Sequence, residues 1–178
     1  MKKTLLFALA LIASGCAETS PRNLDDLVQQ GDTYLDRDTM IPHSGPAFRF
    51  FSNDSRQVGL SANLKDGKMD GPWERYYENG QVEYKSTYVA GERDGPYESY
   101  YGNGQLRSKS TYVADERDGP LETYYMDGQL WEKRIYAAGE SDGPYELYYE
   151  NGQLRRKGSY HDGQKCGEWF EKGETVTY

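Results

Sequence analysis

Aromatic and aliphatic residues alternate with charged residues along most of this chain, and the alternation returns every 24 residues. The clearest copy begins at Gly71, and three further copies begin at Gly95, Gly119 and Gly143. Because successive side chains of a β-strand point to opposite faces, this pattern predicts strands with one apolar and one charged face. A fixed period of roughly 20 to 50 residues is typical of a repeat array.

Each copy also predicts a β-hairpin. Asn79 and Gly80 lie between two runs rich in aromatic and β-branched residues. Asn-Gly is the preferred two-residue type I′ turn, because both positions need positive φ. With this turn, strand partners have residue numbers that sum to 159. One predicted face carries Trp73, Arg75, Tyr77, Val82, Tyr84 and Ser86, and the opposite face carries Glu74, Tyr76, Gln81, Glu83 and Lys85.

Two pairs that recur in every complete copy, from Gly71 onward, support this register. Glu74 falls opposite Lys85, and such cross-strand charges disfavour a slipped register more than they stabilise the sheet. Gly71 falls opposite Tyr88, and we expect the ring to lie over the bare glycine. A valine at Gly119 is therefore expected to overpack against the tyrosine opposite it.

The period divides the chain into segments. Residues 45–178 form the repeat domain, with copies starting at Gly45, Gly71, Gly95, Gly119 and Gly143 and a half copy from Gly167. The first copy is degenerate, with a longer turn at 52–57. Residues 27–44 are predicted to be capping strands and a loop at the first sheet edge, and residues 16–26 a tether. The predicted fold class is all-β, an elongated antiparallel sheet of tandem hairpins on the order of 50 Å long.

The N-terminus predicts export and lipidation. Lys2 and Lys3 precede a short apolar run, so residues 1–15 are typical of a signal peptide. The residues that end at Cys16 resemble the bacterial lipobox, which implies acylation of Cys16 as the mature N-terminus. The alternative is an ordinary signal peptide cleaved near Ala17. Ala17 rather than aspartate after the cysteine implies delivery to the outer membrane, facing the periplasm.

Charge excludes one class of partner. The chain has 21 basic and 29 acidic residues, a net charge of −8, and loss of the signal peptide would make it more negative. Nucleic acid is therefore not an expected partner. Membrane contact is expected through acyl chains, because an acidic body repels anionic headgroups.

Candidate catalytic and metal-ligating residues are sparse. His43 and His161 are the only histidines, and neither has a nucleophile motif beside it. Asp36, Asp38 and His43 fit no standard metal spacing. The repeated glutamates are register partners of lysines, so we expect no enzyme, no catalytic residues, no metal and no cofactor. Cys166 occupies a repeat position held elsewhere by aspartate; it is either a neutral turn residue, a reactive thiol or half of an intermolecular disulfide.

The blocks that begin at Gly67, Trp73 and Tyr145 resemble MORN-repeat-variant proteins, a family often labelled as YwqK-type toxin-antitoxin antitoxins. The resemblance covers about residues 45–178. It implies a β-hairpin array used for interaction, without catalytic residues, and many bacterial members carry a lipoprotein signal. An exported chain would act as an antitoxin only against a toxin in the envelope.

A row of tyrosines on the charged face is the candidate partner-binding site. Tyrosine offers a large contact area with few rotatable bonds, which suits an interface. Successive rings are expected about 10 Å apart, which favours an extended protein partner in the bacterial envelope. The alternatives are a cell-wall glycan stacked on the rings, or a purely structural row. The row consists of Tyr76, Tyr100, Tyr124 and Tyr148.

Overall fold

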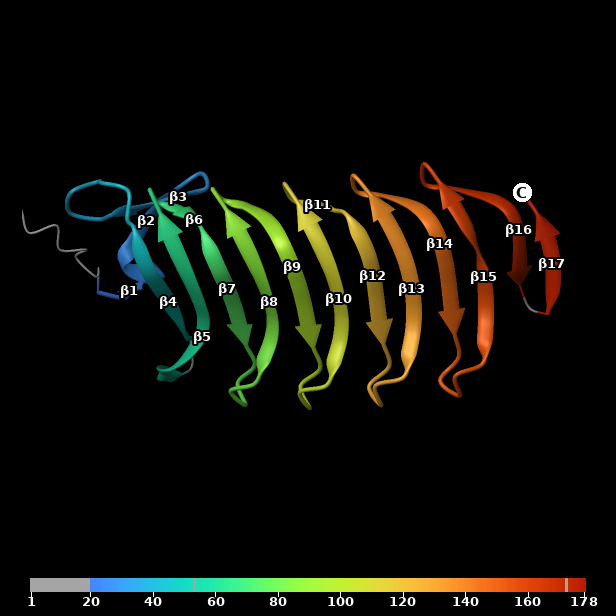
Figure 1. Cartoon of the computed structure of the whole chain (residues 1–178). Coiled ribbons are helices and arrows are strands. Elements are labelled where there is room, and N and C mark those ends of the chain that lie inside the picture. The colour runs from blue at the N-terminus through green and yellow to red at the C-terminus, as the bar shows by residue number, and fades with distance from the viewer. Residues whose placement is uncertain (1–19, 53, 172) are drawn as a thin grey trace, which may run out of the picture.

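The computed structural model describes residues 20–52, 54–171 and 173–178, and they form one long β-sheet with a small cap at its N-terminal end (Figure 1). The predicted signal peptide and Cys16 lie outside the described residues. No helix in the described part is long and apolar enough to span a membrane.

The long sheet is a meander of hairpins joined at alternate edges. Neighbouring strands are antiparallel except β1, which pairs parallel with β4. The predicted all-β sheet of tandem hairpins is thus confirmed. Short strands β6 (Lys68–Met69) and β11 (Glu116–Arg117) pair with β5 and β10. In spatial order the strands are β1 (Arg22–Asn23), β4 (Gly45–Phe51), β5 (Asp54–Lys65), β7 (Gly71–Tyr76), β8 (Val82–Val89), β9 (Glu92–Tyr100), β10 (Leu106–Val113), β12 (Gly119–Tyr124), β13 (Leu130–Ala137), β14 (Glu140–Tyr148), β15 (Leu154–His161), β16 (Gln164–Glu171) and β17 (Glu174–Thr177).

The predicted register holds along most of each hairpin and changes near the turn. Trp73 pairs with Ser86 and Glu74 with Lys85, as expected. One extra residue, Glu83, then bulges out of β8, so Tyr76 pairs with Val82. Similar shifts occur in the later hairpins. The bulge therefore moves Val82 to the charged face, and its predicted place beside Tyr77 is wrong.

The turn type was also predicted wrongly. The Gly80 N–H donates to Tyr77 O (2.9 Å), and the Tyr77 N–H donates to Gln81 O (2.8 Å). Gly80 has φ +82°, whereas Asn79 is not among the described residues with positive φ. This is a three-residue hairpin loop, a type I turn followed by a left-handed glycine. Asn79 contributes by accepting the Gln81 N–H at its side chain (3.0 Å).

The glycine that opens each of the four complete copies lies opposite its tyrosine, but no ring covers it. Gly71 pairs with Tyr88 and Gly119 with Tyr136. A Cβ added at Gly119 would meet no atom within 4 Å, so the expected overpacking is wrong. Glycine is favoured at this position by the backbone conformation instead. Gly119 has φ +94°, a value that residues with a side chain rarely adopt, and the equivalent glycines have similar values.

The N-terminal cap packs on one face of the sheet as well as along its edge. A two-stranded sheet, β2 (Leu27–Gln30) with β3 (Thr33–Asp36), follows the 3-10 turn η1 (Leu24–Asp26). Leu24 and Leu27 are buried against Ala47 and Leu64. The sheet edge itself is covered by β1, which lies in the predicted tether. The tether prediction is therefore wrong for residues 22–26, which are folded because Leu24 has an apolar site to fill.

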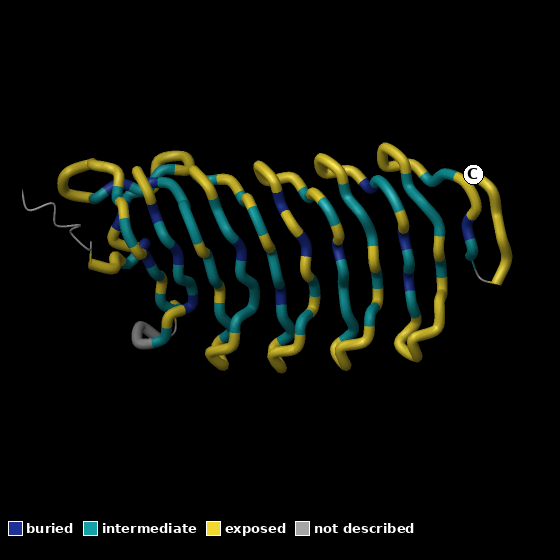
Figure 2. The backbone as a smooth tube through the Cα atoms, viewed as in Figure 1, coloured by how far each residue is buried: buried dark blue, intermediate teal, exposed yellow. Residues whose placement is uncertain are grey.

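Beyond the cap, the described sheet is a single layer, and most of its strand residues are half-buried (Figure 2). We call the face that carries the large rings the aromatic face. Its best-packed region lies near the C-terminus, where Tyr145, Leu147 and Trp169 are buried with Tyr160 against them. The rings of this face include Trp73, Tyr84, Tyr97, Tyr112, Tyr136, Tyr145, Tyr160 and Trp169.

Candidate binding surfaces

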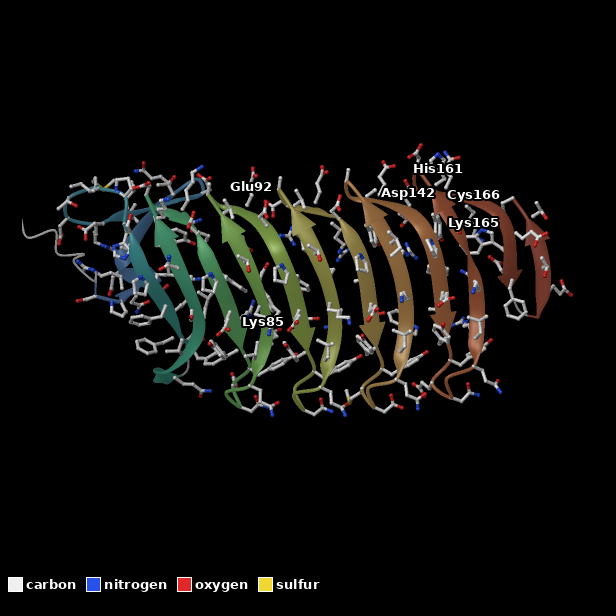
Figure 3. The ribbon with its side chains drawn as sticks, viewed as in Figure 1. Lys85, Glu92, Asp142, His161, Lys165 and Cys166 are labelled. Carbon is white, nitrogen blue, oxygen red and sulfur yellow. The ribbon has the colours of Figure 1, made fainter. Side chains whose placement is uncertain are left out.

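The opposite face, which we call the charged face, carries an alternating ladder of carboxylates and ammonium groups. Each lysine lies opposite a glutamate in its own hairpin, as Lys85 lies opposite Glu74. On its other side, Lys85 also lies opposite Glu98 of the next hairpin. Lys85 lies in mid-strand (Figure 3), and its Nζ is 2.7 Å from Glu98 Oε2. The ladder therefore joins successive repeats as well as the strands of one hairpin. Its members are Glu74, Lys85, Glu98, Lys109, Glu122, Lys133, Glu146 and Lys157.

The tyrosine row lies on this charged face, and its hydroxyls are engaged. Tyr148 Oη donates to Glu146 Oε2 (2.7 Å), and each of the other three tyrosines donates to the glutamate two residues before it. Burial and the nearby Glu98 carboxylate raise the pKa of Tyr100. Hydrogen bonds from Lys85 and Tyr100 lower the pKa of Glu98. The hydroxyls thus support the charge ladder, while the rings stay half-buried.

Aliphatic side chains complete this row, which the sequence-based register did not predict. Because of the bulge, Tyr100 pairs with Leu106 and Tyr124 with Leu130. Residues that pair across strands share a face. We call the resulting band the tyrosine–aliphatic stripe; Leu154, at its C-terminal end, is 37% exposed. It comprises Tyr76, Val82, Tyr100, Leu106, Tyr124, Leu130, Tyr148 and Leu154.

On the aromatic face, guanidinium groups lie between the rings. Arg93 is 4.2 Å from the centre of the Tyr112 ring, and Arg134 is 4.7 Å from that of Tyr145. Arg134 also bonds Glu132 (2.9 Å). Cation–π contacts of this kind contribute most where water is excluded. The arginine side chains thus cover part of these rings and shield them from water, although beyond the cap no second layer of described structure packs on this face.

Tyrosines beside the turns join successive hairpins on the aromatic face. The hydroxyl of Tyr77 donates to the main-chain oxygen of Tyr100 (2.8 Å), and that of Tyr101 donates to Tyr124 O (2.7 Å). Tyr125 repeats the contact with Tyr148 O (2.8 Å). This role was not predicted from the sequence, although the 24-residue recurrence of paired tyrosines was the signal that could have revealed it.

A hollow of about 460 Å³ opens on the aromatic face between the second and fourth copies. Its floor contains three small hydroxyl residues in adjacent strands, Ser99, Ser108 and Thr123, which pair with one another across the sheet. Residues in the same cross-strand row on either side, Tyr84 and Glu132, are larger. The hollow therefore results from a local run of small side chains in an otherwise bulky row.

The histidine and cysteine candidates lie apart from this hollow. Asp142, His161 and Cys166 are near the edge opposite the Asn-Gly turns, toward the C-terminus (Figure 3). The ring of His161 lies 3.4 Å from Asp142 and 3.6 Å from Asp162, and the ligand atoms of these three residues are close enough together to reach one metal ion. Cys166 is half-buried, with its Sγ 3.5 Å from Ser159 O.

Comparison with known families identifies the repeat. The family model described as the MORN repeat variant matches residues 69–90, 93–114 and 141–162. Each match covers one hairpin, and β12 and β13 form a further hairpin with equivalent pairing. Three hairpins of the chain are thus similar to the MORN repeat variant, as the sequence resemblance implied.

Other comparisons add no functional information. No curated protein matches the chain. Among solved structures, a chain in "Crystal structure of GtfA/B complex bound to UDP and GlcNAc" matches 76% of this chain and 26% of its own length. The identity is 11% and the TM-score 0.26. A likeness of this strength supports no argument about function.

Proposed function

We propose that this protein is a non-catalytic interaction scaffold, anchored to the bacterial outer membrane through Cys16, that binds a protein partner in the envelope. The repeats support the scaffold role, because a single layer of hairpins presents two long faces on which a partner can lie. The lipobox-like sequence supports the anchor. Acylation at Cys16 would supply more than one chain, which stable membrane anchoring requires.

The observation that carries the proposal is the tyrosine–aliphatic stripe. Its rings and aliphatic side chains are half-buried or exposed in the isolated chain and recur in four successive hairpins. The glutamate partners hold the tyrosine hydroxyls in place, so ordering the rings on binding costs little further entropy. The charged ladder beside the stripe would provide the polar rim that interfaces use.

An extended protein segment fits this surface better than a sugar chain does. Tyrosines in successive copies are separated by two strand spacings, about 10 Å, which exceeds the length of one sugar ring. An antitoxin-like role fits the same surface, with an envelope-acting toxin as the partner.

The test replaces Tyr100 and Tyr124 together by serine. We expect loss of a cross-linked partner captured from envelope fractions, while the melting temperature changes little. Replacement of Tyr149, which is 44% exposed on the aromatic face, by serine is the matched control and should leave capture intact.

The other outcomes distinguish the alternatives. Unfolding of the double variant would show that the row is structural, and persistent capture would place the interface elsewhere. Loss of peptidoglycan retention instead of partner capture would support the glycan alternative. Mass spectrometry of the mature N-terminus tests the anchor, and an unmodified end at any residue other than Cys16 would refute it.

A further inference from the structure

We propose that the hollow on the aromatic face is a binding site for a short acidic saccharide. The hollow opens on the face opposite the side chains of the tyrosine–aliphatic stripe, although Tyr100 and Tyr124, two members of the stripe, also line it. The hollow is lined by residues of three successive copies, so only the repeat array creates it.

The floor of the hollow favours a ligand rich in hydroxyl groups. Ser99 and Ser108 are hydrogen-bonded to each other (2.7 Å), and Thr123 lies beside Ser108 in the next strand. Hydroxyl groups can both donate and accept, so they match sugar hydroxyls in several orientations. An apolar ring pressed against this floor would leave polar groups desolvated without partners, which is unfavourable.

The walls of the hollow supply flat aromatic surfaces. Tyr84, Tyr97, Tyr101 and Trp131 are among the residues that line it. Trp131 is 40% exposed, although tryptophan is highly buried on average. The equivalent position in the other copies holds Glu83, Arg107 or Arg155, so the indole is specific to this part of the array. Large exposed rings beside a polar floor suit the apolar face and polar rim of a pyranose.

The charge of the hollow favours an acidic ligand. Arg107 and Arg117 both line it, and among the described residues neither guanidinium has a carboxylate partner within ion-pair distance. Arg107 lies 6.0 Å from the Tyr101 ring centre, and Arg117 lies between Tyr112 and Tyr136 at 5.7 and 5.6 Å. The one carboxylate in the lining, Glu83, is bonded to Arg75 (3.1 Å). The chain has a net charge of −8, so two guanidinium groups that no described carboxylate neutralises indicate a site that binds the carboxylate of a ligand.

The size of the hollow fits about two sugar rings, since pockets of roughly 300 to 1,000 Å³ hold small organic ligands. The test therefore uses two disaccharides that differ only in the carboxylate, cellobiouronic acid and cellobiose. Binding to the full-length protein is followed by calorimetry and by tryptophan fluorescence.

We expect cellobiouronic acid to bind and to perturb the fluorescence, and cellobiose to bind about tenfold more weakly, because hydrogen bonds to charged groups are the stronger ones. Trp131→Ala should abolish binding of both. Arg107→Gln should remove the preference for the acid. Arg155→Gln is the matched control, because Arg155 lies over Tyr149 (5.4 Å) as Arg107 lies over Tyr101 but outside the hollow. The Arg155→Gln variant should bind both disaccharides as the unaltered protein does.

Three outcomes would overturn the proposal. Failure of both disaccharides to bind at millimolar concentration refutes a saccharide site. Equal binding of the two refutes the role of the guanidiniums. Binding that survives Trp131→Ala, in a variant whose melting curve is unchanged, places any saccharide site elsewhere.

Discussion

Gly158 lies on the aromatic face directly beneath the indole ring of Trp169. A Cβ built at Gly158 would come within 2.2 Å of a Trp169 ring atom. The equivalent residues in earlier copies are Ser86, Ser110 and Arg134. The aromatic ring over a bare glycine, expected at the start of each copy, thus occurs here for a different pair of residues, and the Phe51 ring lies against Gly59 in a similar way.

Gly158→Ala should lower the free energy of unfolding by about 1–3 kcal/mol, because the buried Trp169 ring must shift to admit the methyl group. Thermal or urea melts measure the loss. Gly102→Ala is the control, since a Cβ there meets nothing within 4 Å and Gly102 has no positive φ, so its effect should stay within about 0.5 kcal/mol. Equal effects in the two variants would contradict the packing argument.

At the scale of the strand, the charge ladder couples each hairpin to the next. Lys109 pairs across the sheet with Glu98 and Glu122, and its Nζ lies 2.8 Å from Glu122. Half-exposed pairs contribute little singly, typically about 0.2–1 kcal/mol. Their regular spacing matters more, because a slip of one residue would break every pair in the row at once.

The ladder predicts a loss of stability in acid. Hydrogen bonds from Lys109 and Tyr124 lower the pKa of Glu122, and those from Tyr148 and Lys157 lower that of Glu146. A carboxyl with a lowered folded-state pKa stabilises the fold above its unfolded pKa, about 4.3. This stabilisation disappears as the pH falls through the lower folded pKa.

We therefore expect the melting temperature to fall steeply below about pH 4.3. Glu122→Gln should be slightly less stable near neutral pH and should show a shallower fall in acid, because a glutamine side chain at this position cannot titrate. Melts at a series of pH values provide the measurement. Parallel curves for the two proteins would show that Glu122 does not contribute to the acid transition.

At the scale of the whole molecule, contacts lie between neighbouring copies, so the array should tolerate the loss of one copy. Deletion of residues 119–142 joins Asp118 to Gly143 at equivalent positions of the repeat. We expect a folded protein with a lower melting temperature, because stability in a linear array is approximately a sum over units and their interfaces.

Circular dichroism melts and size-exclusion chromatography measure this outcome. The same deletion removes Trp131 and Thr123 from the hollow, so it should also abolish binding of cellobiouronic acid. A chain that fails to fold after the deletion would show that its stability depends on contacts beyond neighbouring copies.

The sequence alone determined the period, the strand pairing over most of each hairpin, and the faces of Glu74, Lys85 and Tyr76. These features follow from local rules: alternation along a strand and recurrence of equivalent residues. It also predicted which glutamate lies opposite each lysine within a hairpin, because these positions depend only on the register. The close ion pairs of Lys85 and Lys109 with the next hairpin were not predicted.

Only the tertiary structure decided which residues near the turn share a face. The Glu83 bulge brings Val82 beside Tyr76, and a bulge depends on how the turn, strand twist and neighbouring hairpin fit together. The cap lies on the aromatic face because Leu24 and Leu27 find an apolar site there, a contact between distant segments. The hollow likewise needs three copies side by side, so no single copy contains the information that predicts it.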